Sequence, residues 1–175
     1  PAKLRSGFDI VRPMFQDSAI PLDYYNTVIY LESGGNPNAK NKQPGQTAGG
    51  IGGITIGTWN SAIKAAGLDP KDLKRDNVQD QALVLRFVTE QNEEALKKFN
   101  QLKGIGGGDP TPANYQRYLA HHFGVSGAME IMNAAEGRTI RGEAKPVLIG
   151  EIIGENAVSK NPWLAPNGKQ LTAKQ

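Results

Sequence analysis

Apolar residues recur along most of this chain at the three- and four-residue spacing of amphipathic helices. The clearest run follows Pro21, a residue suited to the first turn of a helix. Four residues then share one predicted face: Leu22, Tyr25, Ile29 and Glu32. Gly34 and Gly35 are expected to end the helix. Glu32 therefore extends the apolar stripe, where its surroundings disfavour the ionised form of its carboxyl group.

The longest predicted helix covers about residues 77–100, and apolar residues occupy most of its circumference. We expect it to be the central buried helix, with Asp76 in a capping box at its start. Thr55 is expected to cap an earlier helix that carries Trp59 and ends at Gly67.

Two later helices are predicted on either side of Gly124. Thr111 and Pro112 are read as the cap and first residue of one helix, which stops at Gly124. Residues 147–153 also favour a helix. The pattern predicts six to eight helices with at most a small loop or β-hairpin. The protein is therefore expected to be mainly α, with residues 1–20 as an arm or short helix packing on a body of residues 21–175.

A glycine-rich stretch follows Glu32. Residues 34–57 contain eight glycines, and no acidic residue occurs from Ser33 to Leu68. The stretch has neither a P-loop nor a dinucleotide-binding pattern. We expect a flexible rim along a groove, where missing side chains let a bulky ligand approach the backbone. An ordinary glycosidase needs a second nearby carboxylate. The acid-free stretch favours a mechanism in which one carboxylate, Glu32, acts and the substrate supplies its own nucleophile.

Composition removes several classes of function. The chain has 175 residues, a net charge of +3, no cysteine and no long apolar run, which argues against a thiolate metal site and a membrane span. Its two histidines, His121 and His122, are neighbours, so on a helix they point about 100° apart and cannot chelate one ion from one face. No metal or cofactor is expected. Lysines and arginines are scattered, which disfavours nucleic acid as a partner.

Tyr118, His121 and His122 lie three and four residues apart on one predicted helix. Rings with polar tips suit stacking and hydrogen bonding to sugars. The alternative from the residues alone is a core tyrosine beside a surface pair of histidines.

Several motifs in order resemble those of the soluble lytic transglycosylases with the lysozyme-like, goose-type fold. The motifs are Glu32–Pro37 (ESGGNP), Ala48–Thr55 (AGGIGGIT) and Thr58-Trp59. Tyr118–His121 (YLAH) with Gly124 resembles the third motif of bacteriophage virion-associated members. Asn161-Pro162 and Leu171-Thr172 are similar to the C-terminal ends of the same members. The resemblance covers roughly residues 20–175.

This resemblance implies cleavage of the β-1,4 bond between N-acetylmuramic acid and N-acetylglucosamine in peptidoglycan, with formation of a 1,6-anhydro ring. Glu32 would be the general acid and then the base. Ser33 would orient Glu32 or the acetamido group of the substrate. The residues expected to contact the glycan are Ser33, Gly50, Ile51, Gly53, Thr55, Tyr118, His121 and His122. Tyr118 would sit near Glu32.

The chain departs from the family at two places. The family has glutamine where this chain has Gly53, and His122 adds a histidine to the third motif. Two alternatives stay open: a hydrolytic lysozyme of the same fold, and a non-catalytic glycan-binding module of a virion.

The phage-like motif and the lack of a signal-peptide pattern favour a virion-associated enzyme. It would be one module of a larger tail or ejection protein that opens the bacterial cell wall in the periplasm during genome entry.

Overall fold

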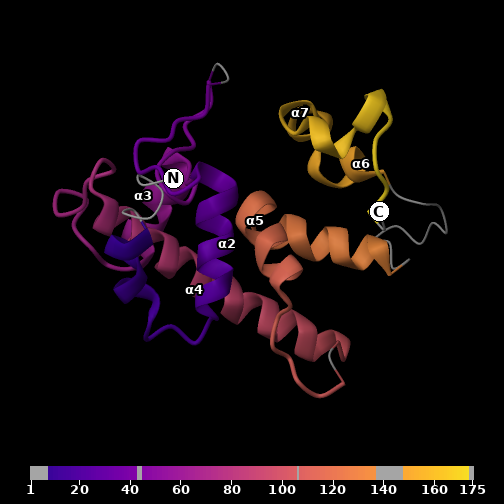
Figure 1. Cartoon of the computed structure of the whole chain (residues 1–175). Helices are drawn as coiled ribbons and strands as arrows, with labels where there is room; N and C mark the ends of the chain where they lie inside the picture. Colours follow the sequence, from indigo (N-terminus) through magenta and orange to yellow (C-terminus); the bar gives the residue numbers. More distant parts are fainter. Residues whose placement is uncertain (1–7, 43–44, 106, 137–147, 174–175) are drawn as a thin grey trace. The chain divides into compact units, whose positions relative to one another are not determined.

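The structure is a computed structural model that describes residues 8–42, 45–105, 107–136 and 148–173, which are mainly helical. Its chain divides into two compact units, Pro1–Glu93 and Glu94–Gln175. The first contains η1 (Arg12–Phe15), α2 (Leu22–Ser33), α3 (Ile56–Ala65) and the larger part of α4 (Val78–Lys103) (Figure 1). The second contains the end of α4, α5 (Asn114–Ala135), α6 (Ile149–Ile153), α7 (Glu155–Lys160), η2 (Pro162–Leu164) and η3 (Pro166–Gly168). None of the described helices combines the length and apolar character needed to cross a bilayer.

Helix α2 confirms the helix predicted after Pro21, which caps its N-terminus in an extended conformation. It ends at Gly34, whose left-handed backbone (φ 61°) lets its amide bond back to Tyr30 O at 2.9 Å. The buried face carries four side chains, Tyr24, Tyr25, Val28 and Ile29, while Glu32 in the last turn is half-buried. The predicted helix phase of Glu32 is therefore confirmed.

The segment before α2 packs on α2 and α4. The Phe15 ring stacks on Tyr25, with 4.2 Å between ring centroids, and Phe15 is 1% exposed. A chain of hydrogen bonds connects the Tyr25 hydroxyl group to α4. The Tyr25 hydroxyl bonds to Ser18 Oγ at 2.9 Å, Ser18 donates to Glu90 at 2.9 Å, and Arg86 Nε pairs with the same carboxylate at 2.8 Å. The described part of the predicted arm, from residue 8 on, thus contacts α2 and α4, while residues 1–7 lie outside the described residues.

Helix α4 is the predicted long helix, with Ala82, Leu85 and Leu96 fully buried along it. The predicted capping box is displaced by one residue. Asn77 is the cap, because its Oδ1 accepts hydrogen bonds from Gln79 N at 2.9 Å and Asp80 N at 3.1 Å.

Helix α5 shows one confirmed prediction and one that is wrong. The helix breaks at Gly124, as expected, with φ 73° and ψ 164°. Its start lies at Asn114 rather than at Pro112, which is buried. The cap residue is Ala113, whose amide donates a hydrogen bond to Gln116 Oε1 at 2.8 Å. A side chain inside the helix therefore replaces the cap expected from Thr111.

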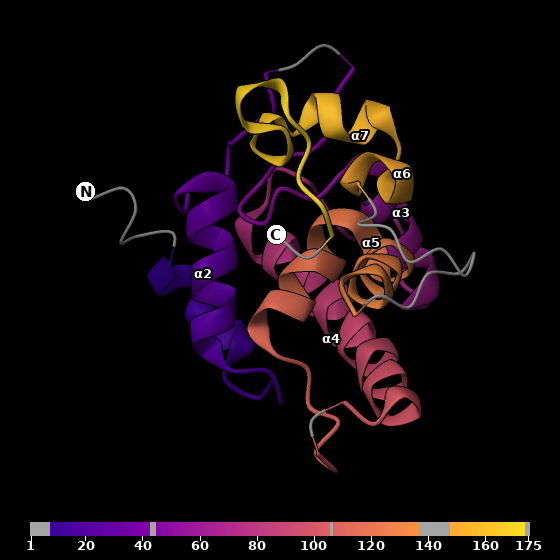
Figure 2. The same ribbon diagram turned by 90° about the vertical axis from the view of Figure 1, so that its right-hand side faces the viewer.

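The second unit has two apolar clusters. One joins α4 to α5 through Leu96, Phe99, Ala120, Ala128 and Met132. The other joins α5 to the C-terminal elements through Ile131, Val158 and Leu164. Helices α6 and α7 pack together and lie side by side in both views (Figures 1 and 2). Helix α6 confirms the helical reading of the apolar run 147–153 for residues 149–153.

Tyr25 makes the first unit sensitive to alkaline pH. Burial raises the pKa of its hydroxyl to about 12 from the ordinary 10.0, although the hydrogen bond to Ser18 lowers it. The folded state therefore favours the protonated phenol. This contribution to stability is complete below about pH 10 and is lost as the pH rises toward 12.

We therefore expect Tyr25→Phe to flatten the alkaline stability curve. Between about pH 9 and 12, urea unfolding should show the parent losing on the order of 1–2 kcal/mol more than the variant, a value discounted for solvent screening. Tyr30→Phe, at a side chain 65% exposed, is the control and should follow the parent. Parallel curves for the parent and Tyr25→Phe would contradict the prediction.

Candidate functional site

Glu32 lies at the C-terminal end of α2, immediately before the chain reverses. The reversal is held by backbone hydrogen bonds from Gly34 N to Tyr30 O at 2.9 Å and from Gly35 N to Ile29 O at 3.3 Å. The Glu32 side chain is half-buried at this position.

The glycine-rich stretch forms a tight turn from Gly49 to Ile54, hereafter the 49–54 turn. Gly49 and Ile54 pair in an isolated antiparallel bridge, with Gly49 N donating to Ile54 O at 3.2 Å and Ile54 N to Gly49 O at 3.1 Å. A second bridge joins Gly49 to Lys40. The small lobe expected from the sequence is therefore a turn with single bridges. No described residue in it belongs to an extended strand.

The glycines of this turn are close-packed. A Cβ at Gly50 would lie 2.8 Å from the Gln81 side chain, and one at Gly52 would lie 2.9 Å from Leu85 Cδ1. Between them the Ile51 side chain is 0% exposed. The glycine-rich rim expected to be flexible is thus held against α4. Its glycines serve the close approach of backbone to side chains.

Gly53 lies directly against the catalytic candidate. A Cβ at this position would overlap the Glu32 carboxylate and would lie 3.1 Å from its Cδ. The φ of Gly53 is also +61°, a region that L side chains rarely adopt. This is the position where the resembled family has glutamine. In this chain the space next to the Gly53 backbone is taken by Glu32 itself.

Ser33 joins the end of α2 to the 49–54 turn. Its Oγ lies 2.8 Å from Ile51 O and 3.0 Å from Ile29 O, so its single proton is shared between these two carbonyl groups. The same oxygen accepts a hydrogen bond from Gly35 N at 3.0 Å. Ser33 therefore holds the 49–54 turn next to Glu32, which precedes Ser33 in the chain. Direct contact between Ser33 and a glycan stays a prediction.

The other predicted contacts of the first unit lie on this framework. The side chain of Ile51 is buried and its amide donates to Gln81 Oε1 at 2.9 Å, while a contact of Ile51 with a glycan stays a prediction. Thr55 is confirmed as the cap of α3, because its Oγ1 accepts a hydrogen bond from Thr58 N at 3.1 Å. Substrate contacts through the backbone of Gly50 or Gly53, or through Thr55, stay predictions.

Two residues missed by the sequence reasoning hold the 49–54 turn. The Arg75 guanidinium donates to Ile54 O at 2.7 Å and to Thr47 O at 3.1 Å, and its centre lies 5.6 Å from the Trp59 ring centroid. Its burial lowers the pKa of Arg75. Gln81 is the second such residue. A glutamine four residues before Leu85, on the apolar face of the long helix, was the signal that could have found it.

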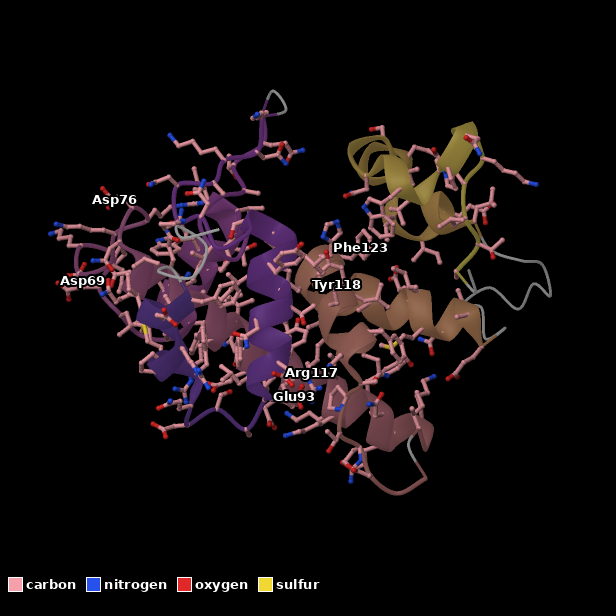
Figure 3. All side chains as sticks on the ribbon, in the orientation of Figure 1. Asp69, Asp76, Glu93, Arg117, Tyr118 and Phe123 are labelled. Atoms are coloured by element: carbon pink, nitrogen blue, oxygen red, sulfur yellow. The ribbon has the colours of Figure 1, made fainter. Side chains whose placement is uncertain are left out.

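The three predicted glycan-binding residues of the second unit come together on the first half of α5. The ring centroid of Tyr118 lies 6.3 Å from that of His121 and 5.9 Å from that of His122. Figure 3 shows Tyr118 and Phe123 on this stretch of α5. Their distance from Glu32, which belongs to the first unit, stays a prediction.

The C-terminal segment adds two partners that the sequence reasoning did not assign. His122 Nε2 lies 2.8 Å from Asn161 Oδ1, and the His122 and Trp163 ring centroids are 5.8 Å apart. Trp163 is 53% exposed and shares the lining of a cavity of about 500 Å³ with Tyr118 and Phe123. Such a concave, mostly apolar surface with a few polar tips is typical of small-ligand sites.

The comparisons with known proteins add no relative, since neither a scan against protein-family models nor a search of curated proteins gives a match. In the first unit, one half-buried carboxyl group is held beside a bare stretch of backbone. A carboxyl group in such a setting can act as a proton donor.

The overlap at Gly53 can be tested by comparing two alanine variants. Gly53 and Gly67 both have left-handed backbones (φ +61° and +67°), but a Cβ at Gly67 meets nothing within 4 Å. We expect Gly67→Ala to lower the free energy of unfolding by about 1 kcal/mol, the cost of the left-handed conformation. Gly53→Ala should lower it by about 2–4 kcal/mol, because overlap with Glu32 adds to that cost. Urea unfolding measures both, and equal losses would show that the carboxyl group moves away freely.

Proposed function

We propose that this protein is a peptidoglycan lytic transglycosylase with Glu32 as its general acid and base. The observation that carries the proposal is the half-buried Glu32 carboxyl group at the end of α2, held against the bare backbone of Gly53. The resemblance of the Glu32–Pro37 and Ala48–Thr55 motifs to this family supplies the substrate class. These two motifs are the segments that Ser33 ties together.

In the proposed reaction, the protonated Glu32 gives its proton to the glycosidic oxygen between N-acetylmuramic acid and N-acetylglucosamine. The bond from the muramoyl C1 to that oxygen breaks, and N-acetylglucosamine leaves with the proton. The Glu32 carboxylate then takes the proton of the muramoyl C6 hydroxyl group. The C6 oxygen attacks C1 and closes the 1,6-anhydro ring. The acid is restored, and no water is consumed.

A single carboxylate suffices because the nucleophile belongs to the substrate. An intramolecular hydroxyl group held near C1 reacts at a high effective concentration and needs little activation beyond a base. The 49–54 turn and the residues just after Glu32 contain no acid that could activate a water molecule. This feature favours the ring-closing reaction over hydrolysis.

We further propose a lysozyme-like, goose-type fold for the mainly helical chain, with the 49–54 turn as its small lobe. The aromatic group of Tyr118, His121 and His122 would bind sugar rings. Peptidoglycan strands would be the partner. The setting would be a phage virion protein that acts on the bacterial cell wall.

The decisive test is the product of digestion by the parent and by Glu32→Gln. The parent should release muropeptides with 1,6-anhydro ends, which mass spectrometry identifies because they are lighter by one water than hydrolytic products. Glu32→Gln should lower the rate about 10²–10⁴-fold, the usual contribution of general acid–base catalysis. Glu94→Gln, at an exposed glutamate in α4, is the control and should match the parent.

Two results would overturn the proposal in different ways. Products with reducing ends and no anhydro sugar would make the protein a hydrolytic lysozyme. Wall cleavage that is absent in the parent, together with retained binding to glycan strands, would make it a non-catalytic binding module.

A further inference from the structure

Gln81 occupies a core position of α4 and uses its whole side-chain amide. It is 4% exposed, and it lies beside Ala82 and four residues before Leu85, which are both fully buried. Its Oε1 accepts a hydrogen bond from Ile51 N at 2.9 Å. Its Nε2 donates to Pro37 O at 3.0 Å and to Arg75 O at 2.6 Å. The Gln81 amide thus accepts one hydrogen bond and donates two, and its three partners belong to three separate backbone segments.

These contacts hold the 49–54 turn on both sides of Gly53. Gln81 binds the turn directly at Ile51, two residues before Gly53. It also binds the backbone of Arg75, whose side chain donates to Ile54 O, one residue after Gly53. Since the Gly53 backbone lies against the Glu32 carboxyl group, the position of the turn determines the surroundings of that group.

We propose that Gln81 is a positioning residue for Glu32. It holds the 49–54 turn against the carboxyl group, so that Glu32 keeps one orientation toward its substrate. The catalytic meaning of this role rests on the proposed transglycosylase function. The placement of the turn does not, and it can be measured without any activity.

The chemistry of the amide makes Gln81→Glu an informative variant. A carboxylate has nearly the same shape and keeps the acceptor for Ile51 N, but it has no donor for Pro37 O or Arg75 O. Its negative charge would face two carbonyl oxygens, and the buried contacts would separate. The turn should therefore shift away from Glu32.

Asn100→Asp is the matched control on the same helix. Asn100 is 1% exposed, and its amide also makes three hydrogen bonds: to Pro110 O at 3.1 Å and to Gln116 at 3.2 Å and 2.9 Å. Both variants change a buried amide into an acid, and both should lower the thermal midpoint. These three hydrogen bonds of Asn100 go to residues of the second unit, so Asn100→Asp reports the cost of a buried acid away from the 49–54 turn.

The kinetic measurement uses soluble glycan strands as substrate. Gln81→Glu should lower kcat about 10–100-fold, because a small misplacement of a catalytic group has effects of this size, while KM changes little. The acid limb of its pH–rate profile should also move, since the environment of Glu32 changes. Asn100→Asp should keep kcat within about twofold of the parent and leave the pH profile in place.

A second measurement does not depend on activity. Carbon NMR of the Glu32 carboxyl group gives its titration midpoint, and hydrogen exchange gives the protection of the Ile51 amide. Gln81→Glu should move the midpoint and expose the amide, while Asn100→Asp should change neither. If the parent cleaves no cell wall, the proposed function fails and the NMR comparison still decides the role of Gln81.

The inference is overturned if folded Gln81→Glu matches Asn100→Asp in kcat, in the pH profile and in the Glu32 titration. If Gln81→Glu does not fold, Arg75→Lys takes its place. That variant keeps the positive charge but removes the guanidinium Nη2, which donates to both Ile54 O and Thr47 O. An unchanged Glu32 titration in Arg75→Lys would then overturn the inference.

Discussion

The Ile51 side chain is buried in the core of the first unit. The glycines on either side of it allow the backbone to pack closely against α2 and α4. Burying a turn so closely leaves peptide groups without water, and each then needs a partner. Ser33 supplies the partner for Ile51 O, and Gln81 supplies the one for Ile51 N. Both backbone groups of Ile51 are therefore hydrogen-bonded, and the candidate site depends on these two bonds. Without them, Glu32 would be a glutamate at an ordinary helix end.

The parts of this arrangement that the sequence predicts are local ones. Helix periodicity places Glu32 on the buried face of α2, since residues three and four apart share a face whatever lies beyond. Thr55 caps α3 because its hydroxyl group reaches an amide three residues ahead. The break at Gly124 follows from its positive φ of 73° combined with ψ 164°, a backbone conformation that glycine alone adopts easily.

Other features depend on partners far along the chain and leave no local pattern. Gln81 and Ile51 are 30 positions apart, so the sequence around Gln81 indicates a buried polar residue but does not identify Ile51 as its partner. The glycines are ambiguous for a different reason: flexibility and close packing both need a missing side chain. Thr111 and Pro112 have the composition of a helix start, yet α5 starts at Asn114, where Gln116 bonds both to Ala113 N and to the distant Asn100.

The overlap between a Cβ at position 53 and Glu32 has a consequence for how such a site can change over time. A glutamine there cannot arise as a single neutral step, because the carboxyl group occupies the space that the new side chain needs. Substitutions at position 53 and around Glu32 are therefore epistatic: the effect of one depends on the other, as expected for residues in direct contact. A larger residue at position 53 would therefore require a compensating change in how Glu32 is held.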